Sequence, residues 1–115
     1  MFDLDNIPDV QAEENDLEEV VMGLIINAGS ARSLAWTALK QAKAGDFAAA
    51  RITMERSREA LTEAHRVQTQ LIESDEGEGK IKVSLVLVHA QDHLMTSMLA
   101  RELVAELIEM HEKLQ

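Results

Sequence analysis

The sequence predicts an all-α fold in which three long helices form an antiparallel bundle that associates with further copies of itself. The chain of 115 residues has one proline and five glycines, and good helix formers supply most of its 46% apolar share. Apolar residues recur at steps of three and four residues in three separate segments, as on the buried faces of helices. The third segment is apolar almost all round, so two partner helices cannot cover it. A chain of this length fits one domain with one core.

Residues 1–15 form the predicted N-terminal tail. They are acidic, contain Pro8 and show no hydrophobic period, so we expect a flexible segment that precedes the helical domain of residues 16–115. They also lack the basic start and apolar centre of a signal peptide.

The first predicted helix starts at Asp16, a suitable N-cap, with Glu18 and Glu19 in its first turn. Gly45 predicts its end. Its buried stripe is expected to comprise Leu17, Val20, Val21, Leu24, Ala28, Ala31, Leu34, Ala35, Ala38, Leu39 and Ala42.

Asp46 is the expected N-cap of the second helix. Two glycines and three acidic residues in residues 74–79 predict its end. Its mostly apolar seam positions alternate strictly at three and four residues, which predicts the seam of an antiparallel bundle. These positions are Phe47, Ala50, Met54, Ser57, Leu61, Ala64, Gln68 and Leu71.

The third helix is expected over residues 80–114. Its opening, residues 81–88, is rich in β-branched side chains, but it runs without a break into strong helix formers. On a helical wheel Leu85, Val88, Met95 and Leu99 fall near Asp92, whereas Leu94 falls on the opposite side. Apolar residues on both sides predict a second interface, and hence an oligomer.

Charge and composition exclude several classes of function. A net charge of −10 argues against a nucleic-acid surface and disfavours an anionic membrane surface. The absence of cysteine excludes disulfides, thiolate metal sites and cysteine nucleophiles. The sequence contains no run of eighteen apolar residues, the length needed to span a bilayer. We therefore expect a cytoplasmic protein.

Four histidines are candidates for chemistry. His65 is expected on the polar side of the second helix, and His111 lies near the end of the third, where a cation opposes the helix dipole. His89 and His93 differ, because they lie four residues apart on the most apolar helix with Asp92 between them. This spacing places both imidazoles on one face and the carboxylate on the adjoining face.

The residues alone leave four interpretations of this group. The side chains could hydrogen-bond one another inside the bundle, because unpaired buried polar groups are costly. Two histidines at this spacing could bind zinc, but no third ligand with a suitable spacing is evident. Asp92 could hold a hard cation such as Mg²⁺ if symmetry supplied more carboxylates. Finally, an imidazole nitrogen could accept a phosphoryl group, with Gln91 and His93 as the nearest phosphate-orienting donors.

A resemblance to a known family favours the last interpretation. The string H-A-Q-D-H-L-M-T at residues 89–96, preceded by V-V-M-G-L-I-I-N-A-G at residues 20–29, resembles the lactose/cellobiose class of enzyme IIA. That class belongs to the phosphoenolpyruvate-dependent sugar phosphotransferase system (PTS). The opening L-D-N-I-P at residues 4–8 and the stretch at residues 64–79 are similar to its diacetylchitobiose branch.

The resemblance implies a homotrimer of three-helix protomers in which His89 carries the phosphoryl group. It also implies that Asp92 and its symmetry mates hold one structural Mg²⁺ per trimer. The donor would be the carrier protein HPr, and the acceptor a cysteine of the cognate IIB component, with the membrane component IIC involved indirectly. The sugar would be a β-linked disaccharide, either diacetylchitobiose or cellobiose. The alternative is a non-catalytic trimeric helical adaptor.

Overall fold

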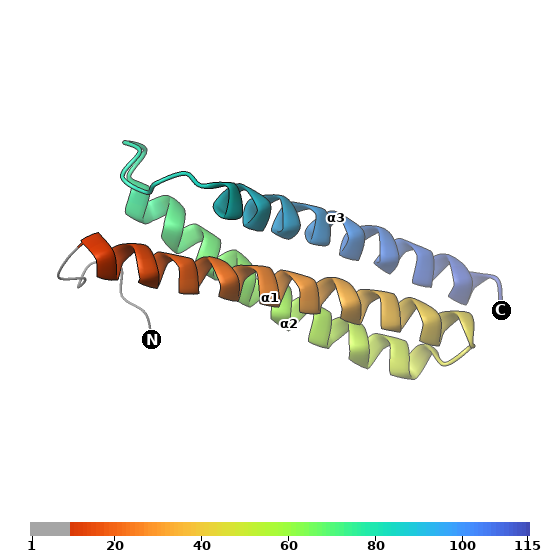
Figure 1. The fold of residues 1–115 in the computed structure, drawn as a ribbon. Coiled ribbons are helices and arrows are strands. Elements are labelled where there is room, and N and C mark those ends of the chain that lie inside the picture. Colours follow the sequence, from red (N-terminus) through yellow and green to blue (C-terminus); the bar gives the residue numbers. More distant parts are fainter. Residues whose placement is uncertain (1–9) are drawn as a thin grey trace.

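The computed structural model describes residues 10–115, and all regular structure in this range is helical. The three helices are α1 (Val10–Lys43), α2 (Phe47–Asp75) and α3 (Leu85–Lys113). They form an elongated bundle of 58 × 23 × 19 Å in which α2 runs antiparallel to α1 and α3 (Figure 1). The prediction of an all-α three-helix fold is confirmed. Of the tail predicted at residues 1–15, residues 1–9 lie outside the described residues.

The turn between α1 and α2 forms as the sequence predicts. Gly45 has a φ of +86°, a conformation that glycine adopts without a side-chain penalty. The Asp46 side chain then accepts a hydrogen bond of 3.1 Å from the backbone N–H of Ala49. This bond satisfies one of the free N–H groups of the first turn of α2.

α1 starts earlier than predicted. It begins at Val10, six residues before the expected N-cap Asp16. The intervening sequence Q-A-E-E contains strong helix formers, and acidic residues near a helix N-terminus interact favourably with its dipole. The expected start was therefore wrong because it relied on the hydrophobic stripe alone.

α3 starts later than predicted, because residues 80–84 are not helical. The Ser84 hydroxyl accepts a hydrogen bond of 3.2 Å from the N–H of Leu87 and caps the helix. Before it, the Asp75 carboxylate accepts hydrogen bonds from the N–H groups of Gly79 and Ile81. These bonds hold the α2–α3 connection in a non-helical path, and β-branched residues offer little helix propensity to oppose it.

The core is narrow because small residues line it. α1 packs against both other helices, whereas α2 and α3 touch each other less. Leu24 and Leu94 are fully buried at the centre of one end of the bundle, and Val104 and Ile108 lie in the core of the other end. Between them Ser57 donates a hydrogen bond of 2.6 Å to the Ala31 carbonyl, which ties α2 to α1. The predicted buried seams of α1 and α2 are confirmed at their central positions.

Candidate functional site

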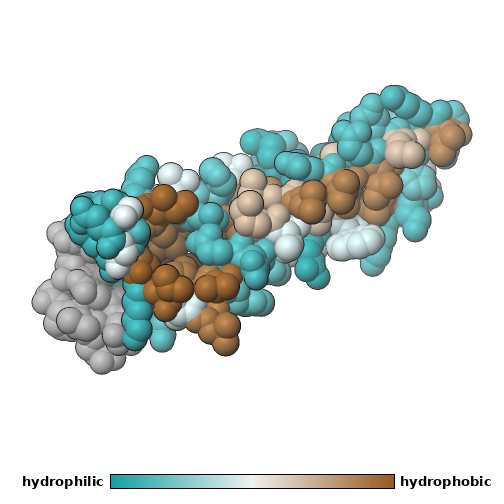
Figure 2. Space-filling view, turned by 90° about the horizontal axis from the view of Figure 1, so that it is seen from above, coloured by the Kyte–Doolittle hydropathy of each residue, from teal (hydrophilic) through white to brown (hydrophobic). Residues whose placement is uncertain are grey.

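α3 exposes a row of large apolar side chains along the face that points away from α1 and α2. Figure 2 shows this row on the surface of the bundle. Their exposed fractions range from 42% at Leu107 to 87% at Leu85. We call this set the α3 stripe; it comprises Leu85, Val88, Met95, Leu99, Leu103, Leu107, Met110 and Leu114. The structure thus confirms that two partner helices leave one side of α3 uncovered.

Asp92 lies within the α3 stripe. It is exposed, and helical geometry places it one turn from both Val88 and Met95. No cluster of three or more metal-ligating side chains is found in the part of the chain that the structure describes. A single protomer therefore offers one carboxylate here, and a cation site would need carboxylates from other copies.

His89 and His93 lie at the edge of the α3 stripe and pair with each other. They are about 40° apart around α3, and His89 is about 60° from Asp92. Their rings stack with centroids 5.9 Å apart and planes inclined by 8°. His89 is exposed and His93 is half-buried. The ring of His89 is therefore the outer ring and is accessible to a partner, while the ring of His93 is the inner ring and supports it.

His93 also lies against α1 at Gly29. A Cβ atom on this glycine would lie 3.1 Å from Nε2 of His93. Burial lowers the pKa of His93 below its usual value of 6.5, and the nearby charges of Arg32 and His89 lower it further. The inner ring of the pair is thus held as a neutral imidazole near pH 7, which can donate one hydrogen bond and accept another.

Gln91 is not brought together with this pair. Two residues along a helix correspond to about 160° around its axis, so Gln91 lies on the far side of α3 from His89. Its side chain is half-buried there. Within one protomer, the placement favours His93 over Gln91 as the group beside a phosphoryl on His89.

The other two histidines lie away from the pair. His65 is exposed on α2, and His111 is in the last turn of α3. Both placements agree with the sequence prediction, which gave neither residue a chemical role.

Gly29 is the residue at this site that the sequence reasoning overlooked, although it lies in the string that carried the resemblance. A glycine inside a helix costs about 1 kcal/mol relative to alanine and therefore suggests a packing reason. Here the reason is the ring of His93 on the neighbouring helix. The sequence shows the glycine within the helix, but it does not show which residue of α3 packs against that glycine.

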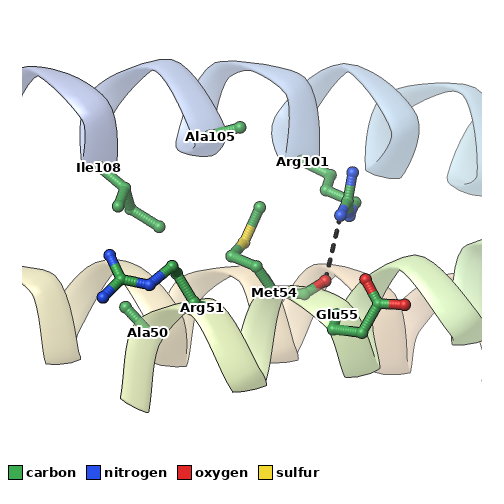
Figure 3. A pocket seen from close by; sticks show the side chains of 7 residues that line it. All are labelled: Ala50, Arg51, Met54, Glu55, Arg101, Ala105 and Ile108. Carbon is green, nitrogen blue, oxygen red and sulfur yellow. Dashed lines mark hydrogen bonds between the residues drawn. The ribbon is translucent and has the colours of Figure 1, made fainter. Parts of the chain in front are cut away.

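A depression lies between α2 and α3, farther along the bundle from the histidine pair (Figure 3). It has a volume of about 230 Å³ and is lined by Ala50, Arg51, Met54, Glu55, Arg101, Ala105 and Ile108. Its polar groups are mostly engaged within the protein. Arg101 donates a hydrogen bond of 3.1 Å to the Met54 carbonyl, Arg51 pairs with Glu112, and Glu55 pairs with Arg58.

Comparison with known proteins identifies the class to which this helical protomer belongs. The family described as "PTS system, Lactose/Cellobiose specific IIA subunit" matches residues 19–112. The chain is therefore a member of the lactose/cellobiose-specific IIA family of the phosphotransferase system. The expected resemblance is confirmed.

Among individual relatives, one specific for diacetylchitobiose is very similar. The N,N'-diacetylchitobiose-specific EIIA component of Escherichia coli (strain K12) is 76% identical over 115 residues, which cover 100% of this chain and 99% of that protein. The cellobiose-specific EIIA component of Lactococcus lactis subsp. lactis (strain IL1403) is 43% identical over 101 residues, covering 88% of this chain and 87% of that protein.

Solved structures agree with the fold. The complex of IIA(chitobiose) with HPr from Escherichia coli contains a chain that is 78% identical with a TM-score of 0.76; the match covers 85% of this chain and 95% of that one. The cellobiose-specific enzyme IIA of Bacillus anthracis is 45% identical with a TM-score of 0.81, covering 84% of this chain and 89% of that one. Within the described residues, no helix has the length and apolar character that crossing a membrane requires.

Proposed function

We propose that this protein is a cytoplasmic phosphocarrier in which His89 accepts a phosphoryl group from HPr and passes it to a cysteine of the cognate IIB component. The observation that carries the proposal is the exposed imidazole of His89, stacked on the half-buried ring of His93. The similar IIA(chitobiose) chain was solved in complex with HPr, which supports the same donor here. The membrane component IIC acts downstream, without contacting this chain.

The chemistry is an in-line displacement at phosphorus. The lone pair of an imidazole nitrogen of His89 attacks the phosphorus of phosphorylated HPr, and a new N–P bond forms as the donor's N–P bond breaks. The electron pair of the broken bond stays on the donor's imidazole. Transfer onward repeats the step with a cysteine sulfur as the nucleophile. Little covalent chemistry is left to the protein, so positioning by His93 and the helix surface supplies the catalysis.

The specificities of similar relatives support a proposal for the transported sugar. The sequence is 76% identical to a diacetylchitobiose-specific component and 43% identical to a cellobiose-specific one. These identities support diacetylchitobiose as the proposed sugar, with cellobiose as the alternative. Aromatic side chains that stack on sugars total three in the whole chain, so the sugar itself is bound by a partner component.

We further propose that three copies assemble through the α3 stripe. With Asp92 counted as one of its positions, the stripe runs from Leu85 to Leu114 in eight steps that average about 3.6 residues, the period of a straight helix. Three such helices can bury the stripe around one axis with little supercoiling. Burying these side chains is strongly favourable, at about 25 cal/mol per Å² of apolar surface.

In this trimer the three Asp92 carboxylates face one another at the axis. Three buried negative charges are unfavourable unless they are neutralised. Oxygen donors suit Mg²⁺, so we propose one structural Mg²⁺ per trimer held by Asp92 of each copy. Because Asp92 would be buried at the trimer axis, the cation would stabilise the assembly and take no part in the transfer.

The test of the carrier function is the intact mass of the protein after incubation with phosphoenolpyruvate, enzyme I and HPr. Wild type should gain one acid-labile phosphoryl group, as phosphohistidine is acid-labile. His89→Ala should gain none, and His65→Ala, which changes an exposed histidine on α2, should behave as wild type. A wild type that gains no mass would refute the proposal and favour the non-catalytic trimeric adaptor.

A further inference from the structure

The central part of α1 contains no acidic side chain. Residues 20–45 include neither aspartate nor glutamate, although the chain has 21 acidic residues. The facing part of α3 is similar, because residues 85–101 contain Asp92 as their sole acidic residue. Apart from Asp92, the histidine pair therefore has no acidic residue within these two facing segments. Such a face suits an anionic group.

Arg32 is the cation on this face. It is exposed, and it forms no ion pair with any residue that the structure describes. Its helical neighbours at three and four residues are Ala28, Gly29, Ala35 and Trp36, none of which carries a negative charge. Several other cations of the protein do have acidic partners, as in the pair of Arg58 with Glu55.

The position of Arg32 places its charge near the histidines. It lies three residues after Gly29, which contacts His93, and on nearly the same face of α1. Side chains of a helix lean towards its N-terminus, so Arg32 leans back towards the level of Gly29. The charge of Arg32 also contributes to lowering the pKa of His93. The charge of Arg32 is thus near enough to act on the pair, and Arg32 has no ion-pair partner among the described residues.

We propose that Arg32 binds the phosphoryl group carried by His89. This inference rests on the proposed phosphocarrier function and names a further residue of the same site. A guanidinium presents N–H donors in a planar fork that matches two oxygens of a phosphoryl group. During the transfer these donors would stabilise the equatorial oxygens while the N–P bond forms on His89 and the donor's N–P bond breaks. His93 would support the ring from below, and Arg32 would contact the oxygens.

The experiment compares Arg32→Gln and Arg32→Lys with Arg56→Gln in the full-length protein. Arg56 is exposed on α2, so its replacement makes the same change of charge on a helix that does not carry the pair. Two quantities are measured for each variant: the rate of phosphoryl transfer from phosphorylated HPr, and the pKa of the phosphoryl group from the ³¹P signal. For the second measurement the protein is phosphorylated chemically with phosphoramidate. The signal that is missing in His89→Ala identifies the phosphoryl on His89.

Arg32→Gln should slow the transfer about ten- to hundredfold, the loss expected for a hydrogen bond to a charged group. It should also raise the pKa of the phosphoryl group by about one unit, because an adjacent cation favours the dianion. Arg32→Lys should fall between wild type and Arg32→Gln, since it keeps the charge without the fork. Helical circular dichroism should be unchanged in all variants.

If Arg32→Gln matches Arg56→Gln in both transfer rate and phosphoryl pKa, the inference is wrong while the carrier function stands. If wild type accepts nothing from phosphorylated HPr, the carrier function is wrong. In that case the chemically phosphorylated protein still decides whether Arg32 binds the phosphoryl group.

Discussion

The two glycines inside α1 provide a sharp test of how the histidine pair is positioned. Both lie in the same helix, but they differ in what a methyl group would meet. At Gly29 a Cβ would lie 3.1 Å from Nε2 of His93, whereas at Gly23 nothing lies within 4 Å. Alanine is favoured over glycine in a helix interior by about 1 kcal/mol. Gly23→Ala should therefore raise the free energy of unfolding by about 1 kcal/mol.

Gly29→Ala should gain the same helix propensity and lose most of it again. A contact of 3.1 Å is a few tenths of an ångström closer than ordinary packing, and overpacking of this kind costs about 1 kcal/mol or more. The net change in unfolding free energy should be close to zero. The ring of His93 can relieve the contact by shifting, and such a shift would disturb its stacking with His89. Phosphoryl transfer to His89 should consequently slow, with little loss of stability.

Urea unfolding gives the stabilities, and the transfer rate from phosphorylated HPr gives the activity. The expected pattern is a more stable, fully active Gly23→Ala and a Gly29→Ala of near wild-type stability with reduced transfer. If Gly29→Ala were as stabilised as Gly23→Ala and equally active, His93 would not be confined by α1. The account of the inner ring as a support for His89 would then be refuted.

Four further changes test other parts of the structure. Asp92→Leu should leave the trimer intact without a divalent cation; sedimentation with and without EDTA measures this, and a dissociated variant would contradict the proposed metal site. His93→Gln should flatten the pH dependence of stability. Since the pKa of His93 is lowered from 6.5 in the folded state, the unfolded chain binds more protons as the pH falls below that value, and wild type loses stability there. Urea unfolding between about pH 5 and 7 checks this, and equal slopes would refute it. Leu94→Ala, in the core, should cost about 2–5 kcal/mol of unfolding free energy. Leu99→Ala, in the α3 stripe, should mainly weaken association in sedimentation, and the reverse result would argue against the trimer interface.

The helix boundaries show which helix ends can be predicted from local sequence signals. Gly45 and Asp46 were predictable because the residue types needed for a helix stop and an N-cap follow one another directly. The start of α3 was not, because it depends on the Asp75 carboxylate reaching the N–H of Ile81 six residues away. The hydrophobic period continued through residues 81–84 and concealed the boundary. Periodicity therefore located the helices but not all of their ends.

The candidate site divides in the same way. His89, His93 and Asp92 lie on one helix, so their spacing alone gave their relative placement. Gly29 contacts His93 from α1, and Arg32 is proposed to act from the same helix, but no pattern within α1 says which turn of α3 it meets. The register between two parallel helices is set by the packing of the whole bundle. For this reason the sequence predicted the imidazoles and missed the residues of α1 that surround them.

The distribution of charge explains how a protein with a net charge of −10 can handle a phosphoryl group. Charges on the surface are screened over about 8 Å at physiological ionic strength, so a phosphoryl group on His89 responds to its nearest neighbours. In the proposed site those neighbours would be the neutral ring of His93, the cation of Arg32 and a stretch of α1 without acids. Asp92 is the nearest carboxylate along α3, about 60° away on the stripe side. If three copies bury the α3 stripe, that carboxylate is turned to the axis and neutralised there, and the exposed side of α3 is left to the anion. Assembly would then shape the electrostatics of the site as well as cover its apolar surface.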